Sequence, residues 1–222
     1  MSPPLAPTPA SAPPPPYTIV HDDGVLLIVD KPFGLPSQAE ATGGAAHLYG
    51  LLCARFGYVG LHHRLDTPAS GLLAFTRHRR ANAPLAAAFR AGAVDRQYLA
   101  VVVGDPGPSG RWDAPLDGQN AATRFVRWGT RDGLSALLVT LETGRTHQIR
   151  RHAADAGHPL AGDRRHGGAA SRLWPRLALH AATLALPHPR TGAPLRFTAP
   201  LPADLAALFA PFGPPPRPSD AG

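Results

Sequence analysis

The apolar residues of this chain gather in runs of strand length, separated by turns rich in Gly, Pro and Asp. Residues 97–103 are rich in β-branched side chains, which favour strands, and they end at Gly104-Asp105-Pro106-Gly107. Another such run, residues 25–29, follows the hairpin signal Asp22-Asp23-Gly24. None of these runs is long enough to cross a membrane. The chain is therefore predicted to be built on a β-sheet and to have no membrane span.

Further segments complete the predicted secondary structure. Strands are expected at residues 17–20, 25–29, 72–76, 97–103, 123–128, 135–142 and 193–198. Helices are expected at 45–56, 81–90, 147–156 and 203–209. Meandering strands with helices between them predict an α+β fold with a mainly antiparallel mixed sheet and flanking helices.

The ends of the chain differ from its middle in composition. Residues 1–16 contain eight prolines, and residues 211–222 are also rich in proline. Both segments are predicted to be disordered or polyproline-like. Residues 17–210 show no linker and no internal repeat, and a chain of 222 residues can bury one substantial core. We expect residues 17–210 to form a single domain.

The charge balance favours a polyanionic partner. The formal net charge is +7, carried by 21 arginines and one lysine, Lys31. A codon bias would explain why arginine replaces lysine, but not why the cations outnumber the acids. Arginine binds phosphate through two N–H groups and stacks on bases, so nucleic acid is the favoured partner.

Cysteine and histidine usage gives no sign of a metal or a disulfide. Cys53 is the single cysteine and lies in an apolar helical pattern, and no secretory signal precedes the domain, so a cytoplasmic location is expected. Eleven histidines raise the possibility of a metal-dependent hydrolase. However, His147 and His152 are five residues apart, and His62 and His63 are adjacent, so neither pair has the spacing of a helical zinc site. No metal is predicted.

Asp66 is the first candidate for chemistry. It lies between an arginine and the Ser70-Gly71 pair, on a loop that leads into a buried strand, with no other acidic residue within fifteen positions. Such an aspartate is either a turn former or a nucleophile or base at the edge of a sheet.

A second dense cluster covers residues 141–152. A strand leads through a glycine turn to Thr146, the expected N-cap of a helix. Arg150 and Arg151 then fall near the positive end of the helix dipole, where a cation is disfavoured by about 0.3–1 kcal/mol. A buried carboxylate or an RNA phosphate would offset this cost. The alternative is that both arginines are solvated at the surface.

Two other residues have open roles. Tyr98 in the strand at 97–103 either packs in the core or lines a pocket and stacks on a base. Lys31 stands beside Pro32 with no glycine-rich phosphate loop, which favours a structural or RNA-contact role over a Schiff base. Asp163, after Gly162, is expected to be a turn residue near a pocket.

Taken together, these segments resemble the RluA-type family of RNA pseudouridine synthases, from about residue 20 to residue 201. The matching motifs occur in the family's order: Lys31-Pro32-Phe33-Gly34, His63-Arg64-Leu65-Asp66 with Ser70-Gly71, Arg96-Gln97-Tyr98, Thr143-Gly144-Arg145-Thr146-His147-Gln148-Ile149-Arg150-Arg151-His152, and Gly157 to Asp163. Five motifs in the right order are a far more specific signal than any one of them.

The resemblance implies a pseudouridine synthase fold and an enzyme that isomerises uridine in ribosomal or transfer RNA without cofactor or metal. A monomer is expected, because no extra helical seam or edge-pairing signal stands out in the sequence. The resemblance also implies Asp66 as the catalytic carboxylate, acting on the base, the sugar or the sugar 2′ proton. Arg150 would pair with that carboxylate, Tyr98 would stack on the uracil and assist deprotonation at C5, and Arg64 would fill the space of the flipped nucleotide. The remaining residues expected to contact RNA are His63, Arg145, His147, Gln148, Arg151 and Lys31.

The chain departs from the family pattern at three positions. Ala69 stands where Thr is usual, Arg96 replaces the commoner Lys, and His166 lies where Tyr often occurs. None of the three removes a group with an assigned chemical role, although each could affect loop packing or substrate choice. The competing interpretation is an RNA-binding protein that has kept the fold but not the reaction. An isolated carboxylate facing an anionic ligand argues against it.

Overall fold

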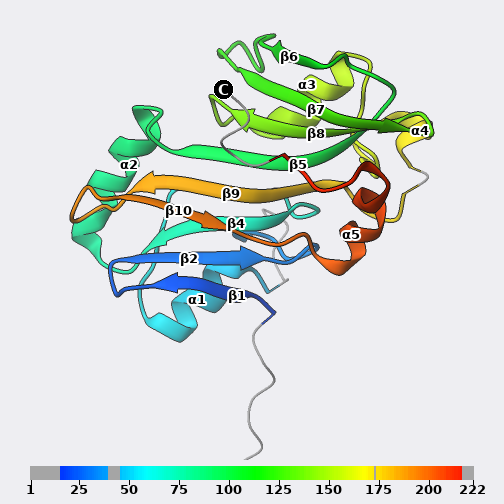
Figure 1. Ribbon diagram of the computed structural model, residues 1–222. Helices are drawn as coiled ribbons and strands as arrows, with labels where there is room; N and C mark the ends of the chain where they lie inside the picture. The colour runs from blue at the N-terminus through cyan, green and yellow to red at the C-terminus, as the bar shows by residue number, and fades with distance from the viewer. Residues whose placement is uncertain (1–15, 40–45, 173, 217–222) are drawn as a thin grey trace, which may run out of the picture.

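A ten-stranded sheet runs through the part of the chain that the computed structural model describes, residues 16–39, 46–172 and 174–216 (Figure 1). Its strands are β1 (Thr18–Asp22), β2 (Leu26–Lys31), β3 (Gly60–Leu61), β4 (Ser70–Thr76), β5 (Asp95–Val103), β6 (Ser109–Trp112), β7 (Thr123–Arg131), β8 (Leu134–Leu141), β9 (Leu179–Pro187) and β10 (Pro194–Thr198). The main order is β1-β2-β4-β9-β5-β8-β7-β6, with β3 beside β4 and β10 beside β9.

The pairing explains the class of the fold. Neighbouring strands are antiparallel except β4 and β9, which run parallel where Ser70 and Gly71 lie opposite His180 and Ala181. The predicted α+β fold on a mainly antiparallel mixed sheet is confirmed.

Helices cover both faces of the sheet. Leu48 and Leu52 of α1 (Leu48–Phe56) and Ile149 of α3 (Gln148–Asp155) pack in one core cluster. On the opposite face, Leu85 of α2 (Asn82–Arg90) and Leu205 of α5 (Ala203–Phe209) pack in two others. Three shorter helices are α4 (Gly168–Ser171) and the 3-10 turns η1 (Arg79–Ala81) and η2 (Ala210–Phe212).

Burial on both faces explains the continuous apolar runs in the sequence. In β2, Leu27 and Val29 point into the cluster that contains α1 and α3, whereas Leu26 and Ile28 point into the cluster that contains α2. A strand covered on both sides needs apolar side chains at every position. The run therefore lacks the alternation that marks a half-buried strand.

Sequence reasoning missed one central element. Strand β9 lies between β4 and β5, but its sequence, LHAATLALP, is rich in alanine and has no valine or isoleucine. Alanine is depleted in strands and favours helices, so local propensity hides this strand until its neighbours are in place. The short strands β3 and β6, the short helix α4 and the two 3-10 turns were missed as well. The other predicted strands and helices are present, with ends shifted by a few residues.

The predicted terminal segments fall mostly outside the described residues. Residues 1–15 and 217–222 are not described, and the same holds for residues 40–45 at the start of the helix predicted at 45–56. That helix begins at Leu48, where the His47 side chain accepts a hydrogen bond from the Gly50 amide. At the other end, η2 continues the folded part to Phe212, which packs against the core. No helix in the described ranges is both long and apolar enough to cross a membrane.

Candidate active site

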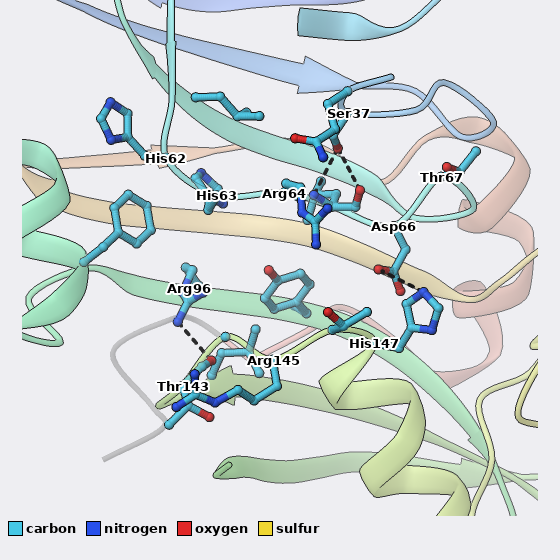
Figure 2. A pocket seen from close by; sticks show the side chains of 18 of the residues that line it. Ser37, His62, His63, Arg64, Asp66, Thr67, Arg96, Thr143, Arg145 and His147 are labelled. Carbon is cyan, nitrogen blue, oxygen red and sulfur yellow. Dashed lines mark hydrogen bonds and ion pairs between the residues drawn. The ribbon is translucent and has the colours of Figure 1, made fainter. Parts of the chain in front are cut away.

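Asp66 lies in the wall of a cleft of about 1280 Å³ (Figure 2). It sits on the loop between β3 and β4, as predicted, and its side chain is 22% exposed. The loop at residues 61–67 forms one wall of the cleft, and the segment at 141–147 forms another. Four arginines line the cleft, Arg64, Arg90, Arg96 and Arg145. The cleft thus holds two carboxylates, Asp66 and Glu142, among these arginines, and Glu142 is paired with Arg111 and Arg124.

The Ser70-Gly71 pair lies where the Asp66 loop joins strand β4. Gly71 lies at φ +114°, and a Cβ placed there would meet the Ala181 carbonyl oxygen at 2.3 Å. Only glycine allows β4 to approach β9 this closely. The Ser70 hydroxyl lies 3.0 Å from His180 Nδ1, inside the same junction. The pair therefore fixes the point at which the loop enters the sheet.

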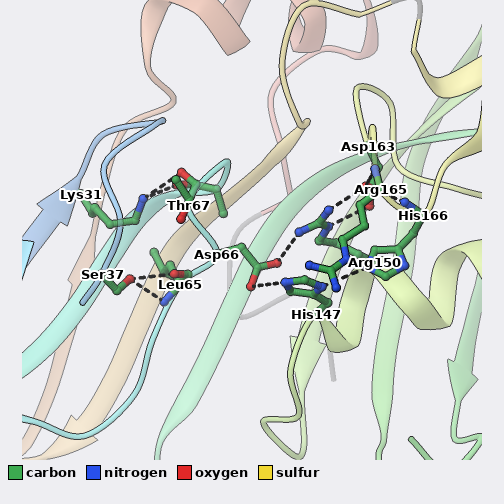
Figure 3. Close-up of polar contacts among 11 residues, drawn as sticks. Lys31, Ser37, Leu65, Asp66, Thr67, His147, Arg150, Asp163, Arg165 and His166 are labelled. Carbon is green, nitrogen blue, oxygen red and sulfur yellow. Dashed lines mark hydrogen bonds and ion pairs between the residues drawn. The ribbon is translucent and has the colours of Figure 1, made fainter. Parts of the chain in front are cut away.

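Arg150 is the direct partner of Asp66. Its Nη1 donates to Asp66 Oδ2 at 3.0 Å, and its Nε and Nη2 each donate to Asp163 at 2.8 Å (Figure 3). Burial by itself would lower the pKa of this guanidinium, but the two carboxylates hold the pKa above its ordinary value. These bonds supply the partner that the helix-dipole argument required. They also exclude the solvated alternative for Arg150.

Asp163 is the residue whose role sequence reasoning underestimated. Its side chain is buried, and besides Arg150 it accepts hydrogen bonds from the backbone amides of Arg165 and His166, each at 3.0 Å. Burial by itself would raise the pKa of Asp163, but its bonds to Arg150 and the amides hold the pKa below the usual value. The sequence feature that could have pointed to this role is the glycine before it. In the structure, Gly162 lies at φ +76° against the Arg176 backbone. A glycine that close to another chain segment indicates a packed loop rather than a solvated turn.

Tyr98 lines both the cleft and a smaller adjoining hollow of about 50 Å³ that Asp66 and Arg150 also line. It belongs to β5 and is 5% exposed. Burial raises the pKa of the phenol, and Asp66 raises it further, whereas Arg96 acts in the opposite sense. The structure therefore brings together the three residues predicted to be catalytic.

His147 has an unusual backbone and faces the carboxylate from the other side. It lies in the left-handed region, with φ 54° and ψ 29°, and takes the N-cap position of α3 that was predicted for Thr146. Its Nε2 lies 3.8 Å from Asp66 Oδ1. Burial lowers the pKa of the imidazole, while Asp66 raises it. The predicted cap at Thr146 is wrong, because α3 begins one residue later, after His147. The left-handed backbone of His147 directs its side chain towards Asp66.

Comparison with known proteins places this arrangement in a family. The family described as RNA pseudouridylate synthase matches residues 25–155, a span that contains Asp66, Tyr98 and Arg150. The chain belongs to this family. It is therefore an isomerase that acts on RNA, and the predicted resemblance is confirmed.

Curated relatives extend the match over most of this RNA pseudouridylate synthase. An RNA pseudouridine synthase of Bacillus subtilis, YjbO, is 36% identical over 89% of this chain and 77% of the relative. The ribosomal large subunit pseudouridine synthase D of Xanthomonas campestris is 35% identical over 87% of this chain and 69% of the relative.

Solved structures agree on the fold. Human RNA Pseudouridylate Synthase Domain Containing 4 superposes with a TM-score of 0.74 at 21% identity, covering 87% of this chain and 92% of that one. Human RNA Pseudouridylate Synthase Domain Containing 1 gives a TM-score of 0.72 at 24% identity, covering 87% and 86%.

Within this synthase, Lys31 lies in the interior, beside the Asp66 loop. Its side chain is fully buried, and Nζ donates to the carbonyl oxygens of Pro32 (2.9 Å), Leu35 (2.8 Å), Thr67 (3.4 Å) and Ala69 (2.6 Å). Burial lowers the pKa of the ammonium to about 7, and Arg176 adds to this lowering, while Asp66 and Asp30 oppose it. Of the structural and RNA-contact roles that the sequence left open, this burial favours the structural one, in which Lys31 holds the loop.

Gln148 is also buried rather than facing RNA. Its side chain accepts from the Thr143 hydroxyl and the Arg145 amide, and donates to Ala122 and Thr123. It therefore fixes the turn before α3, in place of the predicted RNA contact. His63 does line the cleft, and its Nε2 accepts a hydrogen bond from the Ala74 amide.

The predicted RNA-contacting arginines separate into two groups. Arg64 and Arg145 line the cleft, and Arg145 Nε also donates to the Asn120 carbonyl at 3.0 Å. Arg151 lies outside the cleft lining and makes two hydrogen bonds to the exposed Asp117, at 2.8 and 3.0 Å. Arg151 therefore has its own surface partner at the start of α3.

The three departures from the family pattern each have a place. Ala69 is buried in the main core cluster, where it is one of the residues around the end of the Asp66 loop. Arg96 Nη2 donates to the Thr143 carbonyl at 3.0 Å, joining β5 to the segment before α3 (Figure 2). His166 contacts His147. Within the described ranges, no group of three or more His, Cys, Asp or Glu residues could hold a metal ion.

Proposed function

We propose that this chain converts uridine to pseudouridine in ribosomal or transfer RNA, with Asp66 as the catalytic carboxylate and without a cofactor. The observation that carries the proposal is that Asp66 and Tyr98 line one cationic cleft and meet Arg150 in the small hollow that adjoins it. The names of relatives favour large-subunit ribosomal RNA as the substrate.

The reaction needs no outside atom. The bond from N1 of uracil to the sugar breaks, a bond from C5 to the sugar forms, C5 loses its proton and N1 gains one. Asp66 would start this exchange by attacking the base or the sugar, or by removing the sugar 2′ proton. The hydrogen bond of 3.0 Å from Arg150 to Oδ2 supports each of these three roles, because it holds the Asp66 carboxylate in one orientation. The other oxygen, Oδ1, faces His147 and has no hydrogen bond to Arg150.

Tyr98 suits the role of a stacking platform. Its raised pKa keeps the phenol neutral at pH 7, so the ring offers a face to uracil without an opposing charge. A neutral phenol is a poor base, so any assistance at C5 would come through its hydroxyl as one link in a hydrogen-bonded path. The uridine must leave the RNA stack to reach this depth, at a cost of a few kcal/mol. Arg64, exposed at the cleft, would occupy the vacated space.

The test is pseudouridine mapping on total RNA incubated with three proteins: the wild type, Asp66→Asn and Asp117→Asn. Asp117 is an exposed aspartate outside the cleft lining and serves as the matched control. We expect modification at one or a few uridines with the wild type and the control, and none with Asp66→Asn, which should still fold and bind RNA. Modification by Asp66→Asn would overturn the assignment of the carboxylate. A folded wild type that modifies no RNA class would instead support the RNA-binding interpretation.

We also propose that the enzyme acts as a monomer in the cytoplasm. The single cysteine, Cys53, is half-buried in α1 and packs against the main core, as the sequence indicated, which suits a reducing compartment. Light scattering at micromolar concentration would give the mass of one chain, and a dimer mass would refute the monomer.

A further inference from the structure

A second histidine stands behind His147. The Nδ1 atom of His147 lies 3.0 Å from Nε2 of His166, and the two rings meet edge to face at 71° (Figure 3). On the other side of its ring, His147 Nε2 lies 3.8 Å from Asp66 Oδ1. The three side chains therefore form a line from the loop at residue 166 to the Asp66 carboxylate.

Both histidines are held by the elements that also hold Arg150. His147 is aimed by its left-handed backbone at the start of α3. The His166 amide donates to Asp163 Oδ1 at 3.0 Å, and Asp163 in turn binds Arg150. The charged groups facing the pair are Asp66 on the loop, Arg150 and Arg151 on α3, and Asp163 and Arg165 on the following loop. A shift of any one element would separate the two rings.

A neutral histidine carries one N–H, and the hydrogen bond at one nitrogen decides which nitrogen that is. If His147 donates from Nδ1 to His166, its Nε2 presents a lone pair to the Asp66 carboxylate, which is repulsive. If His166 donates from Nε2 to His147 Nδ1, the proton of His147 is on Nε2 and points towards Asp66. Only the second arrangement attracts the carboxylate, so the nearby negative charge favours it.

We propose that His166 is a positioning residue for Asp66: it donates to His147 and thereby keeps an N–H of His147 directed at the catalytic carboxylate. Arg150 then holds Oδ2 and His147 attracts Oδ1, so the carboxylate is oriented from both sides. This inference rests on the proposed function for its activity readout, but not for its geometry.

The proposal predicts a distinctive pH dependence. Burial lowers the pKa of both imidazoles, so both are neutral above pH 7. A protonated His147 carries N–H on both nitrogens and directs one at Asp66 whether or not His166 is present. The contribution of His166 should therefore be present at pH 8 and vanish as the pH falls through the pKa of His147, below 6.5.

The test compares His166→Leu, which has no donor, with His166→Gln, whose amide can place an N–H near the position of Nε2. In steady-state assays at pH 8, we expect kcat of His166→Leu to fall about tenfold with KM unchanged, and kcat of His166→Gln to stay within about threefold of the wild type. At a second pH, set below the pKa of His147 found by its NMR titration, the ratio of wild type to His166→Leu should shrink to about two. His78→Leu, an exposed histidine outside the cleft lining, is the control. Equal losses at both pH values, without rescue by Gln, would overturn the proposal.

Nitrogen-15 NMR of His147 separates this inference from the proposed function. In RNA-free wild type at pH 8, the proton of His147 should be on Nε2, and in His166→Leu the Nδ1–H form should become populated. A wild type with the proton on Nδ1 would refute the inference even if pseudouridine is made. Failure to make pseudouridine would refute the proposed function and leave this measurement intact.

Discussion

Two buried cations flank the Asp66 loop, and they act on different parts of it (Figure 3). Lys31 contacts only backbone carbonyls, including those of Thr67 and Ala69, just after Asp66. Arg150 contacts only carboxylates, those of Asp66 and Asp163. Both side chains are almost inaccessible to solvent. One cation therefore fixes the path of the loop, and the other holds the carboxylate that we propose to react.

This difference follows from the chemistry of the two cations. The compact Lys31 ammonium has three rotatable donors and can satisfy several carbonyls that converge on one point. The planar Arg150 guanidinium has a fixed fork, which binds Asp163 through two nitrogens and leaves Nη1 for Asp66. Loss of Lys31 should thus affect mainly the stability of the fold. Loss of Arg150 should affect mainly the reaction.

The largest effect is expected from Arg150→Lys. A lysine keeps the charge but cannot reach both carboxylates with the same geometry, so Asp66 would lose its fixed orientation. We expect kcat for pseudouridine formation to fall about 100- to 1,000-fold, with folded protein still obtained. Single-turnover kinetics would measure this. Arg151→Lys, at the neighbouring surface arginine, is the matched control and should keep nearly full activity. Equal losses of activity in both variants would refute the special role assigned to Arg150.

The next effect is expected from Lys31→Met, which fills the space but leaves the loop carbonyls without a donor. We expect the free energy of unfolding to fall by about 2–4 kcal/mol in denaturant titrations. The folded fraction should keep kcat within about tenfold of the wild type. A larger loss of kcat than in Arg150→Lys, at unchanged stability, would reverse the roles assigned to the two cations.

The same variant has a pH signature. The pKa of Lys31 is about 7 in the fold and 10.5 in an ordinary lysine, so between these values the unfolded state binds more protons. The stability of the wild type should therefore rise with pH in this window, by up to about 1.4 kcal/mol per pH unit. That stability is lost as the pH falls towards 7. Lys31→Met should lack this rise, and parallel pH profiles would refute a titrating Lys31.

The smallest effect is expected at an exposed cation. Arg64→Ala should leave stability unchanged and raise the KM for RNA by about 3- to 10-fold, with the salt dependence of binding reduced by about one phosphate contact. Filter binding at several salt concentrations would measure it. Arg190→Ala, an exposed arginine outside the cleft lining, should change neither quantity. Loss of stability in Arg64→Ala would place Arg64 with the buried cations.

Much of the site could be predicted from the sequence because its signals are local. The Asp66 loop leading into β4 and the helix that starts near residue 147 follow from turn residues and apolar periodicity. The need for a partner at Arg150 followed from the helix dipole, and Asp66 and Asp163 meet that need. The role of Lys31 stayed open and the burial of Gln148 was not predicted, because the sequence does not show whether a polar side chain near a motif faces solvent or the core.

Taken alone, the sequence determined the strands other than β3, β6 and β9, the four longer helices, the family and the identity of the central residues. Only the tertiary structure decided which groups meet. The structure pairs strand β9 with β4 and β5. It also shows that Asp163 binds Arg150 and that His166 contacts His147. The physical reason is that periodicity and turn preferences act over a few residues, whereas hydrogen-bond partners are chosen by packing between segments distant in the chain.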